Sequence, residues 1–179
     1  MIWREFEELK EKYPKRYEIV LFMLRSGLQV KKVITKRKER FIIACNGAII
    51  PDEQIASVTK TDRRTVELTT ELIGTNPDLF KVFSNISSIA FLKDVAPVLG
   101  LDAIIIEAQD PAKSGIVSKV TEKLKDIPIR QLVAEDPYLA VNEPKLTIIT
   151  DRKIPDDLKS KIYALPEVKR ISKTEEKER

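Results

Sequence analysis

The chain contains no histidine and a single cysteine among its 179 residues. The absence of histidine removes the usual general base, a common zinc ligand and the histidine-activated serine or cysteine nucleophile. Cys45 cannot form an internal disulfide, and its place in an apolar run is typical of a small buried hydrophobic residue. Carboxylate chemistry around Glu107 and Asp110 stays open as an alternative. The sequence predicts a protein that is not an enzyme and that holds no metal or cofactor.

Long apolar runs are also missing. Runs such as residues 103–106 are far too short to span a membrane, and residues 1–7 mix charged with aromatic side chains, unlike a secretion signal. With 42% hydrophobic and 34% charged residues, the composition is that of a globular protein, which we expect in the cytoplasm and not on membranes. Aromatic residues make up only 6% of the chain, which argues against an RNA-binding sheet with exposed rings.

The net charge of +4 lies entirely in the front of the chain. Residues 1–99 carry 17 Lys/Arg against 13 Asp/Glu, whereas residues 100–179 carry 15 of each. The densest basic cluster is residues 31–40, with six basic residues and one acidic residue. A positively charged segment of this kind indicates a polyanionic partner, although a solvated hairpin in a charge-rich protein explains the cluster equally simply.

The spacing of apolar residues predicts mostly helices in the front half. Helices are expected over 2–13 and from 17 to 24, and strands on both sides of the basic cluster and at 48–50. Pro51 and the acids after it are typical of a helix start, Asp62 is typical of an N-cap, and Gly74 is typical of a helix end. These signals predict helices at 51–58 and 63–73, then a short helix after residue 76 and a helical connector over 87–100.

The stretch 55–66 resembles the helix-turn-helix of DNA-binding regulators. Ala56 matches the small residue at which the two helices cross, and Val66 matches the β-branched residue that packs back on the first helix. Lys60 departs from the pattern, since it stands where a turn glycine is usual. The resemblance implies a recognition helix in the major groove and a basic hairpin that acts as a wing on phosphates. The nucleic-acid-binding residues it implies are Arg63, Arg64, Thr65 and Glu67 on the helix, and Lys36, Arg37, Lys38 and Arg40 in the hairpin. A plain helical hairpin without a DNA partner is the alternative.

The spacing of apolar residues in the back half differs from that in the front half. Strands are predicted at 103–106, 129–134, 146–150 and 168–171, and helices at 116–125 and from residue 155. This order, β-α-β-β-α-β, is the ferredoxin-like or split βαβ unit. The sequence therefore predicts an α+β protein.

Residues 101–172 resemble an ACT domain, a small module by which many metabolic enzymes and regulators sense amino acids. The likeness rests on the element order, on the loop 110–115 that opens a helix, and on residues 165–171 between the second helix and the last strand. The resemblance implies an effector bound at the helix N-terminus, usually between paired domains, and a spacing from proline to glycine longer than is usual in the family. The effector-binding residues it implies are Asp110, Pro111, Ser114, Gly115 and Ile116. The alternative is that Gly115 merely makes the turn.

Together the two halves are similar to a group of archaeal predicted regulators of amino-acid metabolism, a likeness carried by residues 61–66 and 91–96. The expected organisation is a winged helix-turn-helix-like domain over 1–86, a connector over 87–100, an ACT domain over 101–173 and a frayed tail over 174–179. We expect an amino-acid-responsive transcriptional regulator, a homodimer or higher even oligomer that binds duplex DNA. The alternative is a regulatory module that controls an enzyme by protein contact without binding DNA.

Overall fold

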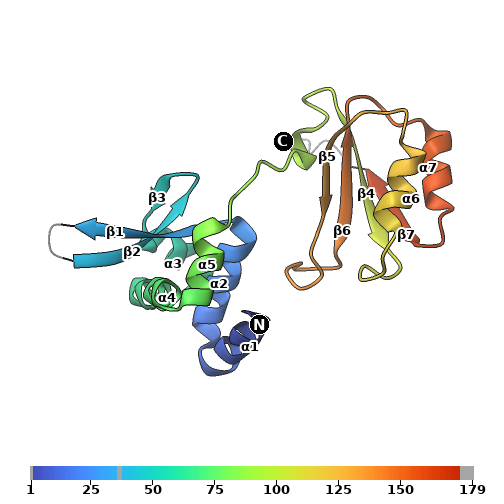
Figure 1. Cartoon of the computed structure of the whole chain (residues 1–179). Helices are drawn as coiled ribbons and strands as arrows, with labels where there is room; N and C mark the ends of the chain where they lie inside the picture. The colour runs from blue at the N-terminus through green and yellow to red at the C-terminus, as the bar shows by residue number, and fades with distance from the viewer. Residues whose placement is uncertain (1, 36–37, 174–179) are drawn as a thin grey trace. The chain divides into compact units, whose positions relative to one another are not determined.

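The computed structural model describes residues 2–35 and 38–173, and the chain divides into two compact units, residues 1–89 (unit 1) and 90–179 (unit 2) (Figure 1). Each unit combines helices with one antiparallel sheet, so the predicted α+β class is confirmed. The expected tail over 174–179 and the hairpin residues Lys36 and Arg37 lie outside the described residues. No helix in the described ranges is both long and apolar enough to cross a membrane.

The described part of unit 1 contains five helices and a three-stranded sheet. Its elements are α1 (Ile2–Lys12), α2 (Pro14–Ser26), β1 (Gln29–Thr35), β2 (Lys38–Cys45), β3 (Ala48–Ile50), α3 (Asp52–Thr59), α4 (Arg63–Thr75) and α5 (Pro77–Asn85). Pro14 opens α2 because a helix does not need an N–H at its first position. Gly27 ends α2 in the left-handed conformation, which glycine adopts without a side-chain clash. The two long strands extend through the basic cluster, so most of residues 31–40 lie on strands and not in a loop.

The sheet of unit 1 has the order β1-β2-β3 and packs one face on the helices. Val30, Ile43 and Ile50 occupy one row across the three strands, because Val30 pairs with Ile43 and Ile43 pairs with Ile50. This row meets fully buried helix side chains, among them Met23 and Phe83. Unit 1 therefore has a hydrophobic core of its own.

Gly74 was expected to end α4, and that prediction is wrong. The helix continues to Thr75, and Asn76 then caps α5 by accepting hydrogen bonds from the N–H groups of Asp78 (2.9 Å) and Leu79 (3.0 Å). The reason for a glycine at position 74 is space, because a Cβ there would lie 2.2 Å from Cγ of Phe41. A glycine inside a helix can thus mark a close packing contact and not a helix end.

In the described residues, unit 2 contains a four-stranded sheet, two α-helices and one 3₁₀ helix. Its elements are the 3₁₀ helix η1 (Lys93–Val95), β4 (Asp102–Ala108), α6 (Ile116–Lys123), β5 (Ile129–Ala134), β6 (Lys145–Thr150), α7 (Asp156–Tyr163) and β7 (Val168–Lys173). The strand order is β5-β6-β4-β7, and every neighbouring pair is antiparallel. The helices α6 and α7 contact each other beside the sheet (Figure 1).

Both faces of the unit 2 sheet carry buried residues. Ile104 and Ile148 lie in the cluster that also contains Val120 of α6 and Ile162 of α7. The neighbouring residues Ala103 and Ile149 point to the opposite face, because successive strand side chains alternate. There they cluster with Ala96 and with the partly buried Leu92 and Leu101. The segment before β4 therefore covers the face that the helices leave open.

The helical connector predicted over 87–100 is wrong, since only the single turn η1 is helical there. The side chain of Gln131 supplies part of the hydrogen bonding that a helix would have provided. Its Oε1 accepts from the N–H of Leu92 (2.9 Å), and its Nε2 donates to the carbonyl of Ala90 (2.8 Å). A glutamine on β5 therefore fixes an irregular segment on the sheet, which a local sequence pattern could not indicate.

Candidate functional site

The corner between α3 and α4 has well-defined local geometry. Lys60 ends α3 in the left-handed conformation, with φ 53° and ψ 42°, and its N–H donates to the carbonyl of Ala56. Non-glycine residues seldom adopt this conformation, and glycine is the residue that adopts it most easily. Ala56 and Val66 are both buried, as the sequence-based alignment of the two helices requires.

Asp62 caps α4, as the sequence predicts. Its Oδ1 accepts from the N–H of Thr65 (2.8 Å), and its Oδ2 accepts from the Thr65 hydroxyl (2.7 Å). These two hydrogen bonds lower the pKa of Asp62, because both favour the ionised carboxylate, and the positive charge of Lys15 lowers it further.

The two arginines at the start of α4 differ in their surroundings. The guanidinium of Arg63 forms ion pairs with Glu53 of α3 (3.1 Å) and Glu67 of α4 (3.0 Å). Arg64 is exposed. Thr65 is half-buried, and its hydroxyl already donates to Asp62. Arg63 and Arg64 are the two basic residues among the four proposed to bind nucleic acid through α4. Of these two, only Arg63 has ion-pair partners among the described residues, and these would compete with a phosphate for its guanidinium.

The hairpin places further basic residues on defined strand positions. Val33 pairs with Arg40 and Lys31 pairs with Ile42, so Lys31 and Arg40 lie on the same face of the hairpin. Lys32 lies on the other face, where its ammonium group pairs with Glu39 at 2.7 Å. Lys36, Arg37 and the side chain of Lys38 lie outside the described part of the chain. Their proposed phosphate contacts stay predictions.

An acidic surface on α4 was missed by sequence reasoning. Glu67 and Glu71 are four residues apart on the exposed side of the helix, and both line a hollow that also contains Asp52 and Glu53. Burial raises the pKa of Asp52, and the negative charges of Glu67 and Glu53 raise it further. The spacing of the two glutamates was visible in the sequence, but their meeting with Asp52 depends on the fold.

A second hollow, of about 190 Å³, lies at the start of α6. Gly115 precedes this helix with φ 99°, and a Cβ at that position would meet no atom within 4 Å. A glycine is needed at this position because of the positive φ, and not because a neighbouring atom leaves no space for a side chain. Since such a φ strains any other residue, the glycine has a structural role in the turn as well as a place at the hollow.

Four of the five predicted effector-binding residues line this hollow, which we call the Gly115 hollow. They are Pro111, Ser114, Gly115 and Ile116. Asp110 is not among the lining residues, and its carboxylate instead accepts from the N–H of Ala112 (3.0 Å) and shapes the loop. The structure adds three charged residues that the sequence did not single out, namely Lys113 in the loop, Glu135 and Lys145. The backbone N–H of Glu135 donates to the carbonyl of Lys145 at 2.9 Å.

No protein-family model matches this chain, and no curated protein sequence matches it. Within residues 2–35 and 38–173, no group of three or more cysteine, aspartate or glutamate side chains is placed to hold a metal ion. The geometry described above gives two candidate sites. One is the α3–α4 corner with Arg63 and Arg64 at the start of α4, and the other is the Gly115 hollow.

Proposed function

We propose that the chain is a regulator that binds duplex DNA through unit 1 and a free amino acid through unit 2. The observation that carries this proposal is the α3–α4 corner. The helices α3 and α4 contact each other and Ala56 of α3 is buried, the turn between them passes through the left-handed Lys60, and Asp62 caps α4. These are the features expected of a helix-turn-helix, which supports α4 as a recognition helix.

The charges on α4 favour contact through its N-terminal end. Arg64 and Lys60 are exposed there, and the helix dipole adds positive potential at the same end. Further along the helix, Glu67 and Glu71 would repel phosphates. We therefore place the N-terminal turn of α4 against the DNA, with Lys31 and Arg40 of the hairpin on the phosphate backbone.

In unit 2 the proposal is a ferredoxin-like domain of the ACT type with its effector in the Gly115 hollow. The strand order supports it, because β6 lies between β4 and β5, as in a split βαβ unit. The lining suits an amino acid. The first N–H groups of α6 and the ammonium groups of Lys113 and Lys145 favour a carboxylate, and the Glu135 carboxylate favours an ammonium group.

The same proposal includes a homodimer, because an effector that changes DNA affinity acts most simply on the spacing of two recognition helices. Light scattering tests this part. A mass near twice 20.5 kDa at micromolar concentration is the expected result, whereas a single chain of 20.5 kDa would contradict it.

The main test is fluorescence anisotropy of the full chain with labelled duplex DNA at several salt concentrations, with and without pooled amino acids. We expect binding that weakens steeply with salt, because phosphate contacts release counterions, and an affinity that changes when the effector is present. No DNA binding in either condition would overturn the DNA part. A thermal-shift response to amino acids would then still support the effector part.

A second candidate function is control of an enzyme by protein contact without DNA binding. The acidic exposed surface of α4 favours it, since Glu67 and Glu71 lie where a recognition helix would meet phosphates, and Arg63 is paired with Glu53 and Glu67. This candidate predicts an amino-acid response in unit 2 and no salt-dependent retention of DNA.

A further inference from the structure

The edge of β2 is only partly covered. β3 pairs with three residues of β2, from Cys45 with Ala48 to Ile43 with Ile50, and the pairing stops there. The next residue, Pro51, has no N–H and leads directly into α3. β2 itself continues to Lys38, so along residues 39–42 no described strand lies on the β3 side.

The hydrogen-bonding parity of β2 shows which backbone groups face this edge. Asn46 (φ 46°) and Gly47 (φ 94°) form a two-residue hairpin turn, which makes Cys45 and Ala48 a hydrogen-bonded pair. Since bonded and non-bonded pairs alternate along an antiparallel ladder, every second residue of β2 points its N–H and C=O toward this side. The N–H and C=O groups of Phe41 and Glu39 therefore point to the uncovered edge.

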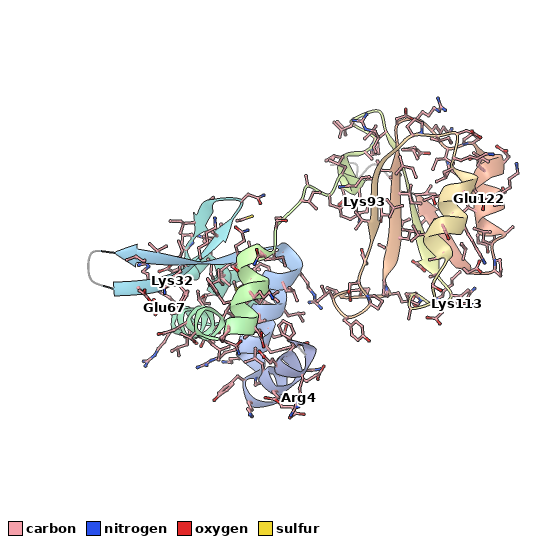
Figure 2. All side chains as sticks on the ribbon, in the orientation of Figure 1. Arg4, Lys32, Glu67, Lys93, Lys113 and Glu122 are labelled. Atoms are coloured by element: carbon pink, nitrogen blue, oxygen red, sulfur yellow. The ribbon has the colours of Figure 1, made fainter. Side chains whose placement is uncertain are left out.

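A hollow of about 530 Å³, which we call the edge hollow, lies along this edge. It is lined by residues 39–43 of β2, by residues 49–53 at the junction of β3 and α3, and by Arg63, Glu67 and Glu71 of α4. Figure 2 labels Glu67 on α4, below the hairpin that carries Lys32. The edge hollow thus combines an open strand edge with apolar side chains of the sheet and a polar wall.

The lining of the edge hollow is acidic. Five carboxylates, those of residues 39, 52, 53, 67 and 71, stand against the guanidinium groups of Arg40 and Arg63, a net charge of −3. Lys32 pairs with Glu39 from the rim, which leaves −2 when it is included. Burial raises the pKa of Asp52, and the neighbouring charges of Glu67 and Glu53 raise it further. A cationic ligand would relieve this repulsion.

We propose that the edge hollow is the docking site of an extended, basic segment of a partner protein, which adds as a strand beside residues 39–42 of β2. Backbone hydrogen bonds to Phe41 and Glu39 supply the pairing, as in other complexes formed by strand addition. Side chains at every second position of the added strand face α4, where lysine or arginine meets Glu67 and Glu71. This site shares no lining residue with the Gly115 hollow, so the partner is distinct from the effector. Arg40 and Arg63 belong both to the edge hollow and to the basic residues proposed for DNA, so the added strand and DNA should compete for unit 1.

The first test uses the full chain and a short fluorescent peptide that alternates lysine with valine. We expect saturable binding that weakens with salt, and no comparable binding of the same peptide with glutamate in place of lysine. The decisive comparison is a peptide of identical sequence with N-methylated backbone amides, which keeps the charges and removes the donors. It should lose binding. Three results would each overturn strand addition. The lysine peptide does not bind, the N-methylated peptide binds as tightly as the unmodified one, or spermine displaces the peptide as effectively as the unlabelled peptide does.

The second test uses variants of the chain. Glu67→Gln combined with Glu71→Gln should weaken the lysine peptide by roughly tenfold at low salt, because two facing charges are lost. Glu122→Gln, which removes an exposed carboxylate from α6 in unit 2, is the matched control and should have no effect. Unchanged peptide affinity in the double variant would contradict the assigned site.

Two variants at Glu39 distinguish the effect of its carboxylate charge from the effect of its backbone hydrogen bond. Glu39→Pro removes the N–H that faces the uncovered edge, and Glu39→Gln removes the same carboxylate but keeps the N–H. We expect Glu39→Pro to bind the lysine peptide several-fold more weakly than Glu39→Gln. Circular dichroism establishes that both are folded, and if Glu39→Pro is not, the N-methylated peptide decides alone. Equal affinities in two folded variants would overturn the pairing.

Discussion

The ring of Phe41 in β2 lies directly against Gly74 in α4, where a Cβ would be only 2.2 Å from the ring. The same ring packs edge-on against Phe80 of α5, with centroids 5.7 Å apart. Phe41 thus connects the sheet of unit 1 to two helices, and it does so through the one position in α4 that has no side chain.

Gly74→Ala should destabilise unit 1. Alanine improves helix propensity by about 1 kcal/mol, but forcing a methyl group against a packed ring costs about 1–3 kcal/mol, so the loss outweighs the gain. Urea unfolding followed by the fluorescence of Trp3, the single tryptophan, measures the effect in unit 1. Ser57→Ala in α3, at an exposed position, is the control and should be neutral or slightly stabilising. A more stable Gly74→Ala variant would contradict the contact.

Unit 1 should lose stability in acid, because the stabilising effect of the ionised Asp62 cap is lost there. The pKa of Asp62 is lowered in the folded chain from the ordinary value of 3.8, so the cap stabilises the fold above pH 3.8 and loses this effect as the pH falls through the lower folded value. Asp62→Asn keeps a capping oxygen but cannot titrate. The difference in stability between the natural chain and Asp62→Asn should therefore shrink as the pH falls below about 4. Denaturant titrations at several pH values measure this difference, and a difference independent of pH would refute the prediction.

The basic residues of unit 1 should affect DNA binding in two ways. Changing Lys36, Arg37 and Lys38 together to alanine should weaken binding to every duplex and flatten the salt dependence by roughly one unit of log–log slope per lost contact. Arg64→Ala should instead cost about 1–3 kcal/mol on a selected site and much less on a scrambled one. Anisotropy on both duplexes separates the two effects. If Arg64→Ala lost the same affinity for both duplexes, Arg64 would contact the DNA backbone and not a base.

Arg63→Ala is the informative comparison for Arg64→Ala. Arg63 is tied to Glu53 and Glu67 in the free chain, and these exposed ion pairs must be broken before it can contact DNA. We therefore expect Arg63→Ala to weaken DNA binding less than Arg64→Ala. The reverse order, measured by the same anisotropy titrations, would mean that Arg63 leaves its carboxylate partners in the complex.

An amino acid should raise the melting temperature of unit 2, and the loop before α6 offers a matched pair of variants. Ser114 lines the Gly115 hollow and Ala112 does not, although both are exposed and lie in the same loop. Ser114→Leu should abolish the thermal shift by filling the hollow, whereas Ala112→Leu should preserve it. A thermal-shift screen over the twenty amino acids makes the measurement. A response that survives in Ser114→Leu would place the ligand elsewhere. Gly115 is a poor target, because its φ of 99° strains any replacement.

Several local elements of this protein could be predicted from the sequence. The cap at Asp62, the helix start after Pro51 and the β-α-β-β-α-β order of the back half were all predicted. Each depends on hydrogen bonds or apolar periodicity within a few residues of the chain, which the local sequence encodes directly.

Other features of the fold and of the sites depend on contacts between elements that are distant in the sequence. The close approach at Gly74 is to a ring thirty-three positions away, and the side chain of Gln131 on β5 hydrogen-bonds the backbone of Ala90 and Leu92. The pairing of Arg63 with Glu53, the addition of Lys145 and Glu135 to the Gly115 hollow and the open edge of β2 likewise depend on which surfaces meet. Packing fills space between elements that are distant in sequence, and no local periodicity records which side chain will occupy that space.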